Sequence, residues 1–238
     1  MSLGIIEQLT HSTVRIETDL HGGGMATGSG FYMHFLKNEE ECVPVIITNK
    51  HVISNAKNGR FHITLAKDNG LPDTGRHLKF EITQFEESFI KHPDPNVDLA
   101  AFLIGPIFNQ LQQQGNIPFY VPIETSLIPT DEERQSFSSM EDIVMIGYPN
   151  GIWDAQNNLP VIRKGITATH SNIALNGKSE FLTDIASFPG SSGSPVFLAN
   201  IGGYMDNKGN TYMGAHRIRL LATSALHQKT EGTSIESN

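Results

Sequence analysis

The stretch 187–197, SFPGSSGSPVF, sets four serines and two glycines directly in front of an apolar segment. Glycine and proline at this density indicate a tight loop, and the apolar residues that follow indicate a β-strand. Such a loop is either an ordinary surface turn or a loop in which one serine acts as a nucleophile. A base and an orienting group elsewhere in the chain would favour the second interpretation.

Outward from this loop, short apolar segments rich in β-branched and aromatic residues follow one another along the chain. Gly, Pro, Asn and Asp separate them. Two short helices are predicted, at 107–115 and at 129–139, where Thr130 and Glu133 form a capping box. Many strands and few helices predict an all-β fold. The predicted strands cover 12–18, 28–36, 43–49, 60–66, 78–86 and 99–105, and then 142–148, 160–171, 179–187, 194–200 and 211–226.

The helical and polar region 105–140 separates the two series of strands. It predicts a boundary between an N-terminal β unit, residues 1–118, and a C-terminal β unit, residues 119–238. A crevice between two such units is a common place for an active site.

Composition narrows the class of partner. The chain of 238 residues has a formal net charge of −8 and no block of Lys and Arg, so we do not expect it to bind nucleic acid. No apolar run is long enough to span a membrane. The single cysteine, Cys42, cannot form an internal disulfide, and the first residues lack the features of a signal peptide, so we expect a cytoplasmic protein. No metal motif is found, because HExxH is absent and DNKGN (206–210) predicts a hairpin turn.

A serine nucleophile needs a base, nearly always histidine, and a group that orients this base. Among ten histidines, His51 stands out because it follows the apolar segment VPVIIT at the point where a strand gives way to a tight turn. Asp98 is the one charge at the head of the apolar run LAAFLI, where a carboxylate needs a polar partner. Each residue alone has an ordinary structural explanation. The order His, Asp, Ser is the one used by the two-barrel serine proteases.

Five segments resemble the trypsin-like serine proteases, and among them the disulfide-free bacterial branch that includes the HtrA/Deg peptidase domains. They are TGSGFYM (27–33), IITNKHVI (46–53), VDLAAFLI (97–104), DIVMIGYPNG (142–151) and TDIASFPGSSGSPVF (183–197).

This resemblance implies a fold of two antiparallel six-stranded β-barrels with a few short helices, without a PDZ domain. It implies a serine endopeptidase that acts on protein or peptide substrates and needs no cofactor. By the same resemblance His51 is the base, Asp98 is the orienting group and Ser192 is the nucleophile.

The glycines of the loop support the choice of Ser192 over its neighbours. Gly190 stands two residues before Ser192 and Gly193 one residue after it, and glycine permits the unusual dihedral angles of a tight loop. Such a loop can aim the N–H groups of Gly190 and Ser192 at one point, which forms an oxyanion hole. Two positions depart from the family, since Ser191 replaces the usual Asp or Asn and Ser194 replaces the usual Gly. Ser191 cannot form the carboxylate–ammonium pair that matures digestive zymogens, so the uncut chain is expected to be competent.

Substrate preference is also implied by the resemblance. In the family, the residue six positions before the nucleophile lies at the floor of the specificity pocket, and here that residue is Ala186. Leu221, Ala222 and Thr223 are the expected walls, and Phe188 is expected to narrow the entrance. A buried Lys or Arg would need a carboxylate at the floor, so this pocket is predicted to prefer Val, Leu or Ala.

Two other interpretations remain open at this point. An α/β-hydrolase would place Ser192 in a nucleophile elbow with Asp206 and with His216 or His227, but the motif Gly-x-Ser-x-Gly fails at Ser194 and alternating βαβ patterns are missing. A catalytically silent protease-like fold that binds proteins or peptides would show the same strands, since a fold does not guarantee an activity.

Overall fold

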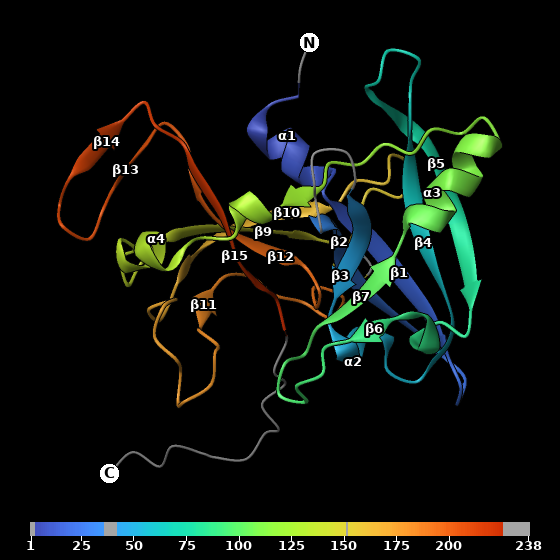
Figure 1. The fold of residues 1–238 in the computed structure, drawn as a ribbon, viewed down its shortest axis with the longest axis horizontal. Helices are drawn as coiled ribbons and strands as arrows, with labels where there is room; N and C mark the ends of the chain where they lie inside the picture. Colours follow the sequence, from blue (N-terminus) through green and yellow to red (C-terminus); the bar gives the residue numbers. More distant parts are fainter. Residues whose placement is uncertain (1–2, 36–41, 151, 226–238) are drawn as a thin grey trace.

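Strands form most of the regular secondary structure, as the alternation of apolar segments and turn residues predicts (Figure 1). The structure is a computed structural model that describes residues 3–35, 42–150 and 152–225. The all-β prediction is confirmed. The first series of elements is α1 (Ile5–Thr10), β1 (Thr13–Leu20), β2 (Met25–Phe35), β3 (Val43–Thr48), α2 (Lys50–Ile53), β4 (Ala56–Ala66), β5 (Pro72–Thr83), η1 (Glu86–Ser88), β6 (Ile90–Lys91), β7 (Ala100–Leu103), α3 (Gly105–Gln113), β8 (Ile123–Glu124) and η2 (Thr125–Leu127). The second series is α4 (Asp131–Gln135), β9 (Asp142–Gly147), β10 (Val161–Thr167), β11 (Thr183–Asp184), β12 (Pro195–Asn200), β13 (Gly203–Met205), β14 (Thr211–Met213) and β15 (Arg217–Thr223).

The first sheet has eight strands in the order β5-β4-β1-β2-β3-β7-β6, with β8 added against β2. All pairs on this path are antiparallel, and β8 alone runs parallel to its neighbour. Its interior is filled by aromatic and aliphatic side chains, with Phe61 in ring contact with Phe85, Phe89 and Phe102. Burial of these large rings is the main force that stabilises the sheet.

The second sheet has five antiparallel strands in the order β11-β10-β9-β12-β15, and β13 and β14 form a separate two-stranded hairpin. The resemblance implied six strands in each barrel, whereas the described residues give eight and five. The first sheet gains β6 and β8, which have only two residues each and carry no readable period. Asp206 accepts hydrogen bonds from the backbone of Lys208 and Asn210, so 206–210 is the predicted hairpin turn.

The two sheets are joined by a shared apolar cluster. Val144 and Ile146 of β9 and Phe197 of β12 pack in one cluster with Phe31 and Met33 of β2. The alternate residues of β9 and β12 point the other way, into a third cluster formed by Ile143, Met145 and Val196. Because side chains alternate across a strand, β9 and β12 are buried on both faces. This packing places the loop before β12 directly beside the first sheet.

The structure confirms the two predicted helices and changes the bounds of two predicted strands. Both predicted helices form, and Thr130 and Glu133 make the reciprocal capping box of α4. The segment 179–187 forms only the short β11, and 211–226 divides at Gly214, which has a φ of 69°, into β14 and β15. The helices α1 and α2 were not predicted, because six and four residues are too few to show a helical period. The boundary at 118/119 stays a prediction, and β8 joins the first sheet just beyond it.

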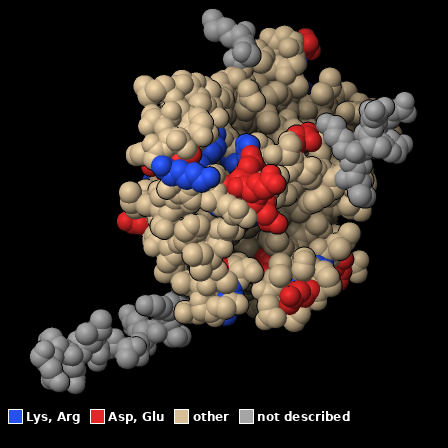
Figure 2. All heavy atoms as spheres, turned by 60° about the vertical axis from the view of Figure 1, so that its left-hand side comes forward, with Lys and Arg blue, Asp and Glu red and all other residues tan. Residues whose placement is uncertain are grey.

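Charged side chains of both signs lie on the surface of the molecule (Figure 2). Figure 2 shows acidic and basic side chains lying next to one another near the middle of one face, so charges of both signs mix there. Glu133 of α4 and Arg219 of β15 form an ion pair. Among the described residues, no helix is long and apolar enough to cross a membrane.

Candidate active site

His51 and Asp98 meet in the structure although 47 residues separate them in the sequence. His51 lies in the one-turn helix α2, directly after β3, and Asp98 lies in the loop before β7, the neighbour of β3 in the sheet. Asp98 Oδ2 lies 2.5 Å from His51 Nδ1, and Asp98 Oδ1 accepts a hydrogen bond of 3.1 Å from the backbone N–H of His51. One carboxylate therefore fixes both the ring and the backbone of the histidine.

The surroundings of this pair differ from the expectation in one respect. We expected the carboxylate in a mostly apolar setting, but the Asp98 side chain is 40% exposed and the His51 side chain 46%. The reason is that Asp98 lies in the surface loop ahead of β7 and not in the strand itself. Asn49, at the N-terminus of α2, donates a hydrogen bond of 2.8 Å to the backbone oxygen of Asp98 and so holds this loop against the helix.

The loop that carries Ser192 has the conformation that its glycines predicted. Gly190 has a φ of 88° and Gly193 a φ of 85°, values that side-chain-bearing residues rarely adopt. A Cβ atom on Gly190 would lie 2.6 Å from the backbone nitrogen of Asn150 and 2.8 Å from the carbonyl oxygen of Tyr148. Glycine is required at this position by space as well as by dihedral angle.

Two backbone N–H groups of the loop are left unused. Among the described residues, neither the N–H of Gly190 nor that of Ser192 donates a hydrogen bond. The carbonyl groups of the same two peptide units are occupied, because Pro189 O accepts from Asn150 N at 2.6 Å and Ser191 O accepts from Ser194 N at 3.0 Å. The C=O and N–H of a trans peptide point in opposite directions, so these bonds turn both free N–H groups away from Asn150 and Ser194.

The loop is attached to the first sheet through Ser29 of β2. Ser29 N donates to Ser192 O at 2.8 Å, and Ser29 Oγ donates to Gly190 O at 3.0 Å while it accepts from Tyr148 N at 2.8 Å. Thr48, at the end of β3, donates to Ser29 O at 2.7 Å. Ser29 and Thr48 thus connect the loop that carries Ser192 to the strand that leads into the helix of His51. Sequence reasoning did not assign a role to either residue, although Ser29 lies in the quoted segment TGSGFYM.

Ser192 is less deeply buried than Ser191 and Ser194. Ser192 is largely buried, and no hydrogen bond joins its Oγ to the ring of His51. Such catalytic hydrogen bonds often tighten only when a substrate binds. The two neighbouring serines are more deeply buried, and they are inaccessible to a reactant from solvent.

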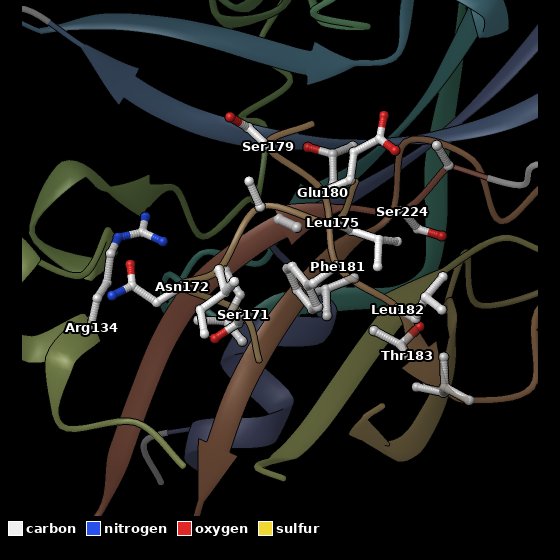
Figure 3. A pocket seen from close by; sticks show the side chains of 18 of the residues that line it. Arg134, Ser171, Asn172, Leu175, Ser179, Glu180, Phe181, Leu182, Thr183 and Ser224 are labelled. Atoms are coloured by element: carbon white, nitrogen blue, oxygen red, sulfur yellow. The ribbon is translucent and has the colours of Figure 1, made fainter. Parts of the chain in front are cut away.

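A hollow of about 890 Å³ lies beside the loop, over the second sheet (Figure 3). Leu221, Ala222 and Thr223 of β15, three predicted substrate-binding residues, line it. Its opposite side is formed by the segment between β10 and β11, from which Leu175, Phe181 and Leu182 surround the hollow in Figure 3.

The two other predicted substrate-binding residues lie outside this lining. Ala186 and Phe188 are both exposed, whereas Ile185 and Ser187 line the hollow. The alternation arises because successive side chains of this extended segment point to opposite sides. The placement of Ala186 at a pocket floor stays a prediction.

The residues of the α/β-hydrolase interpretation do not form a site. Asp206 is engaged in its own hairpin turn, His216 Nδ1 accepts from Gly202 N at 3.1 Å, and His227 lies outside the described residues. The antiparallel sheets exclude this fold. In the described part of the chain, no group of three or more His, Cys, Asp and Glu side chains could hold a metal ion.

A comparison of the sequence with models of protein families identifies the family of this chain. The model of the trypsin-like peptidase domain matches residues 28–202. The chain belongs to the trypsin-like peptidase domain family. The matched range contains His51, Asp98 and Ser192, and the antiparallel sheets are those of a chymotrypsin-like all-β fold. The resemblance found in the sequence is confirmed, and peptidases of this family act on proteins or peptides.

A comparison with solved structures matches this chain to two proteases, among others. An HtrA-type protease, AlgW with a tripeptide, is 16% identical, with a TM-score of 0.47, over 91% of this chain and 58% of that chain. The Rv3671c protease from M. tuberculosis, in its active form, is 15% identical, with a TM-score of 0.41, over 91% of this chain and 78% of that chain. This chain therefore spans less than two thirds of the AlgW chain. A comparison with curated proteins finds no match.

Proposed function

We propose that this trypsin-like peptidase domain is a serine endopeptidase that cleaves peptide bonds through an acyl-enzyme intermediate. Ser192 is the nucleophile, His51 is the general base and acid, and Asp98 holds the histidine. The observation that carries the proposal is that the Asp98 carboxylate contacts both the ring Nδ1 and the backbone N–H of His51. With the proton on Nδ1 facing the carboxylate, Nε2 is the basic nitrogen of the ring.

The reaction follows from these roles. His51 Nε2 takes the proton of Ser192 Oγ as this oxygen attacks the carbonyl carbon of the scissile peptide bond. The carbonyl oxygen becomes an oxyanion and accepts hydrogen bonds from the N–H groups of Gly190 and Ser192. The C–N bond then breaks, the proton passes from His51 to the leaving amine, and the acyl group stays on Ser192. A water molecule, deprotonated by His51, releases the acid product and restores the serine.

The oxyanion hole is supported by the loop's hydrogen bonds. The carbonyl groups of the same two peptide units accept hydrogen bonds from Asn150 and Ser194. These bonds fix the orientation of both peptide units, so the two N–H donors need no rearrangement before reaction. Preorganised donors are worth about 3 kcal/mol each in comparable sites. The same preorganisation supports activity of the uncut chain, because no new N-terminus is needed to order this loop.

The hollow supports a preference for aliphatic side chains in the substrate. Nine of the twenty residues that line it are aliphatic and one is aromatic. Its charged residues, Asp131, Arg134 and Glu180, come from α4 and from the β10–β11 segment. The wall formed by Leu221, Ala222 and Thr223 carries no acid to receive a Lys or Arg. Each well-placed methylene of the substrate would contribute roughly 1–3 kcal/mol to discrimination.

Labelling with a fluorophosphonate tests the proposal. The wild-type chain should be modified once, on Ser192, and the Ser192→Ala variant should remain unmodified. Ser194→Ala is the matched control, since Ser194 Oγ is buried and makes no hydrogen bond among the described residues. Labelling of Ser192→Ala at the wild-type rate would refute the assignment. No labelling of the wild type over a broad pH range would favour the catalytically silent peptide-binding module.

A further inference from the structure

Arg163 of β10 is a buried cation beneath the nucleophile loop. Its residue surface is only 8% exposed, and its neighbour Lys164 points outward to an ion pair with Asp142. Arg163 Nη1 donates a hydrogen bond of 2.6 Å to Ser191 Oγ and one of 3.2 Å to the backbone oxygen of Ala186. The guanidinium therefore contacts the residue directly before the nucleophile.

Among the residues that the structure describes, no acid pairs with this charge. In the part of the chain that the structure describes, Arg163 forms no ion pair, and its Nε and Nη2 atoms are buried without a hydrogen-bond partner. Burial lowers the pKa of the Arg163 guanidinium. A buried charge without a counter-charge is costly, and all of the side-chain hydrogen bonds that Arg163 makes go to the segment 186–191.

These hydrogen bonds close the turn that contains Gly190. Ser191 Oγ accepts from Arg163 and from Phe188 N at 3.2 Å, and Ser191 N donates to Phe188 O at 2.9 Å. The turn from Phe188 to Ser191 is thus closed at its base, while the guanidinium also holds Ala186. The peptide unit between Pro189 and Gly190 lies inside this closed turn, so its orientation depends on the position of Ser191.

We infer that Arg163 is a positioning residue, which holds Ser191 so that the N–H groups of Gly190 and Ser192 face a common point. The inference rests on the proposed function, because it assigns to Arg163 the support of the proposed oxyanion hole. In this arrangement a neutral hydroxyl at position 191 receives a buried cation from β10. No newly formed N-terminus is needed to hold the residue before the nucleophile.

The test is a double-mutant cycle with Arg163→Met and Ser191→Ala, and with Lys164→Met as the matched control on the same strand. The first readout is the second-order rate constant for fluorophosphonate labelling of Ser192. Each single variant should lower it by about tenfold or more, and the double variant should be no slower than the slower single variant, because both changes break the same contact. Lys164→Met should label at the wild-type rate.

A second readout separates positioning from stability. Methionine at position 163 removes a buried charge that has no counter-ion, so the urea midpoint of Arg163→Met should not fall below that of Lys164→Met. Hydrogen exchange of the Ser191 and Ser194 amides, which both donate within the loop, should nevertheless become about tenfold faster. A fall in reactivity without a fall in stability is the signature of a positioning role.

The possible results decide between the proposals. Wild-type labelling and unchanged exchange in Arg163→Met would overturn the role of Arg163, as would effects of the two single variants that multiply in the double variant. If the wild type itself does not label, the proposed function fails, and the exchange rates still decide whether Arg163 holds the loop. If Arg163→Met does not fold, Ser191→Ala must show the same faster exchange and slower labelling, and a normal result would overturn the inference.

Discussion

Replacement of Gly193 by alanine measures how closely the loop that carries Ser192 approaches the first sheet. Gly193 has a φ of 85°, and a Cβ atom there would overlap the carbonyl oxygen of Ser29 and lie 2.5 Å from Thr48 Oγ1. This carbonyl group belongs to the backbone of β2, which is paired with a strand on each side in the first sheet, so it cannot move aside. The alanine must therefore push the loop away from the sheet.

The cost can be worked from the contacts that would be lost. Alanine in the left-handed region costs about 1 kcal/mol, and overpacking of a buried site about 2 kcal/mol. Displacement of the loop would break the hydrogen bonds from Ser29 N to Ser192 O and from Gly193 N to Ser224 O, at about 1 kcal/mol each. The free energy of unfolding should fall by about 5 kcal/mol, which is a large part of the stability of an ordinary domain.

Gly209→Ala is the matched control. Gly209 has a φ of 84°, nearly the value of Gly193, but a Cβ atom there would meet nothing within 4 Å. This variant should lose only the backbone cost of about 1 kcal/mol. Urea unfolding followed by the fluorescence of Trp153, the single tryptophan, measures both variants, since its ring packs against Arg15 of β1 and Tyr148.

The stability losses of Gly193→Ala and Gly209→Ala test whether the loop is in close contact with Ser29. If Gly193→Ala and Gly209→Ala lose the same free energy, the dihedral angle alone accounts for the effect and the close approach to Ser29 is wrong. If Gly193→Ala also labels at the wild-type rate, the position of the Ser192 N–H does not depend on this contact.

Three further predictions concern specificity, activation and pH. A peptide-library cleavage profile should show Val, Leu or Ala before the cut bond, and dominant cleavage after Lys or Arg would show that the pocket is misplaced. Mass spectrometry of the chain labelled by fluorophosphonate should show the uncut mass, and reactivity confined to a form cut near its N-terminus would contradict a preformed loop. Burial raises the pKa of Glu17, but hydrogen bonds from Arg15 and Arg60 outweigh this effect and lower the pKa to about 2. Its stabilisation, up to about 3 kcal/mol, is present above pH 4.5 and lost as the pH falls towards 2; Glu17→Gln should flatten urea stability over this range, and an unchanged slope would exclude the ion pairs as its cause.

The candidate site was readable from the sequence where local chemistry defines it. Glycines around Ser192 indicated a tight loop with unusual dihedral angles, and Gly190 and Gly193 do adopt positive φ angles. His51 and Asp98 stood at the ends of apolar segments, and the pairing of β3 with β7 brings them together. The exposure of Asp98 was not foreseen, because the pattern of an apolar run does not reveal whether the residue before it lies in the strand or in a surface loop.

The residues that contact the Ser192 loop from other elements, Ser29 and Arg163, could not be predicted from the sequence. Ser29 and Gly190 are 161 residues apart, and their hydrogen bond exists because β2 and the loop before β12 meet where the two sheets join. Arg163 shows no signal in its own segment, VIRKGIT, where it alternates with Lys164 as any strand residue would. A basic residue at an inward position of a strand was the one available sign, and it could be recognised only once the inward face of β10 was known.

The sequence by itself determined the class of fold, the two helices with their capping box, the hairpin at 206–210 and the glycine-flanked serine. These features depend on side-chain periodicity, capping and turn chemistry, which act between residues a few positions apart. The tertiary structure alone decided the number of strands in each sheet, the attachment of the Ser192 loop to Ser29, the burial of Arg163 beneath Ser191 and the shape of the hollow. These depend on how two sheets pack against each other, since burial of their shared apolar cluster brings distant segments into contact that no local pattern encodes.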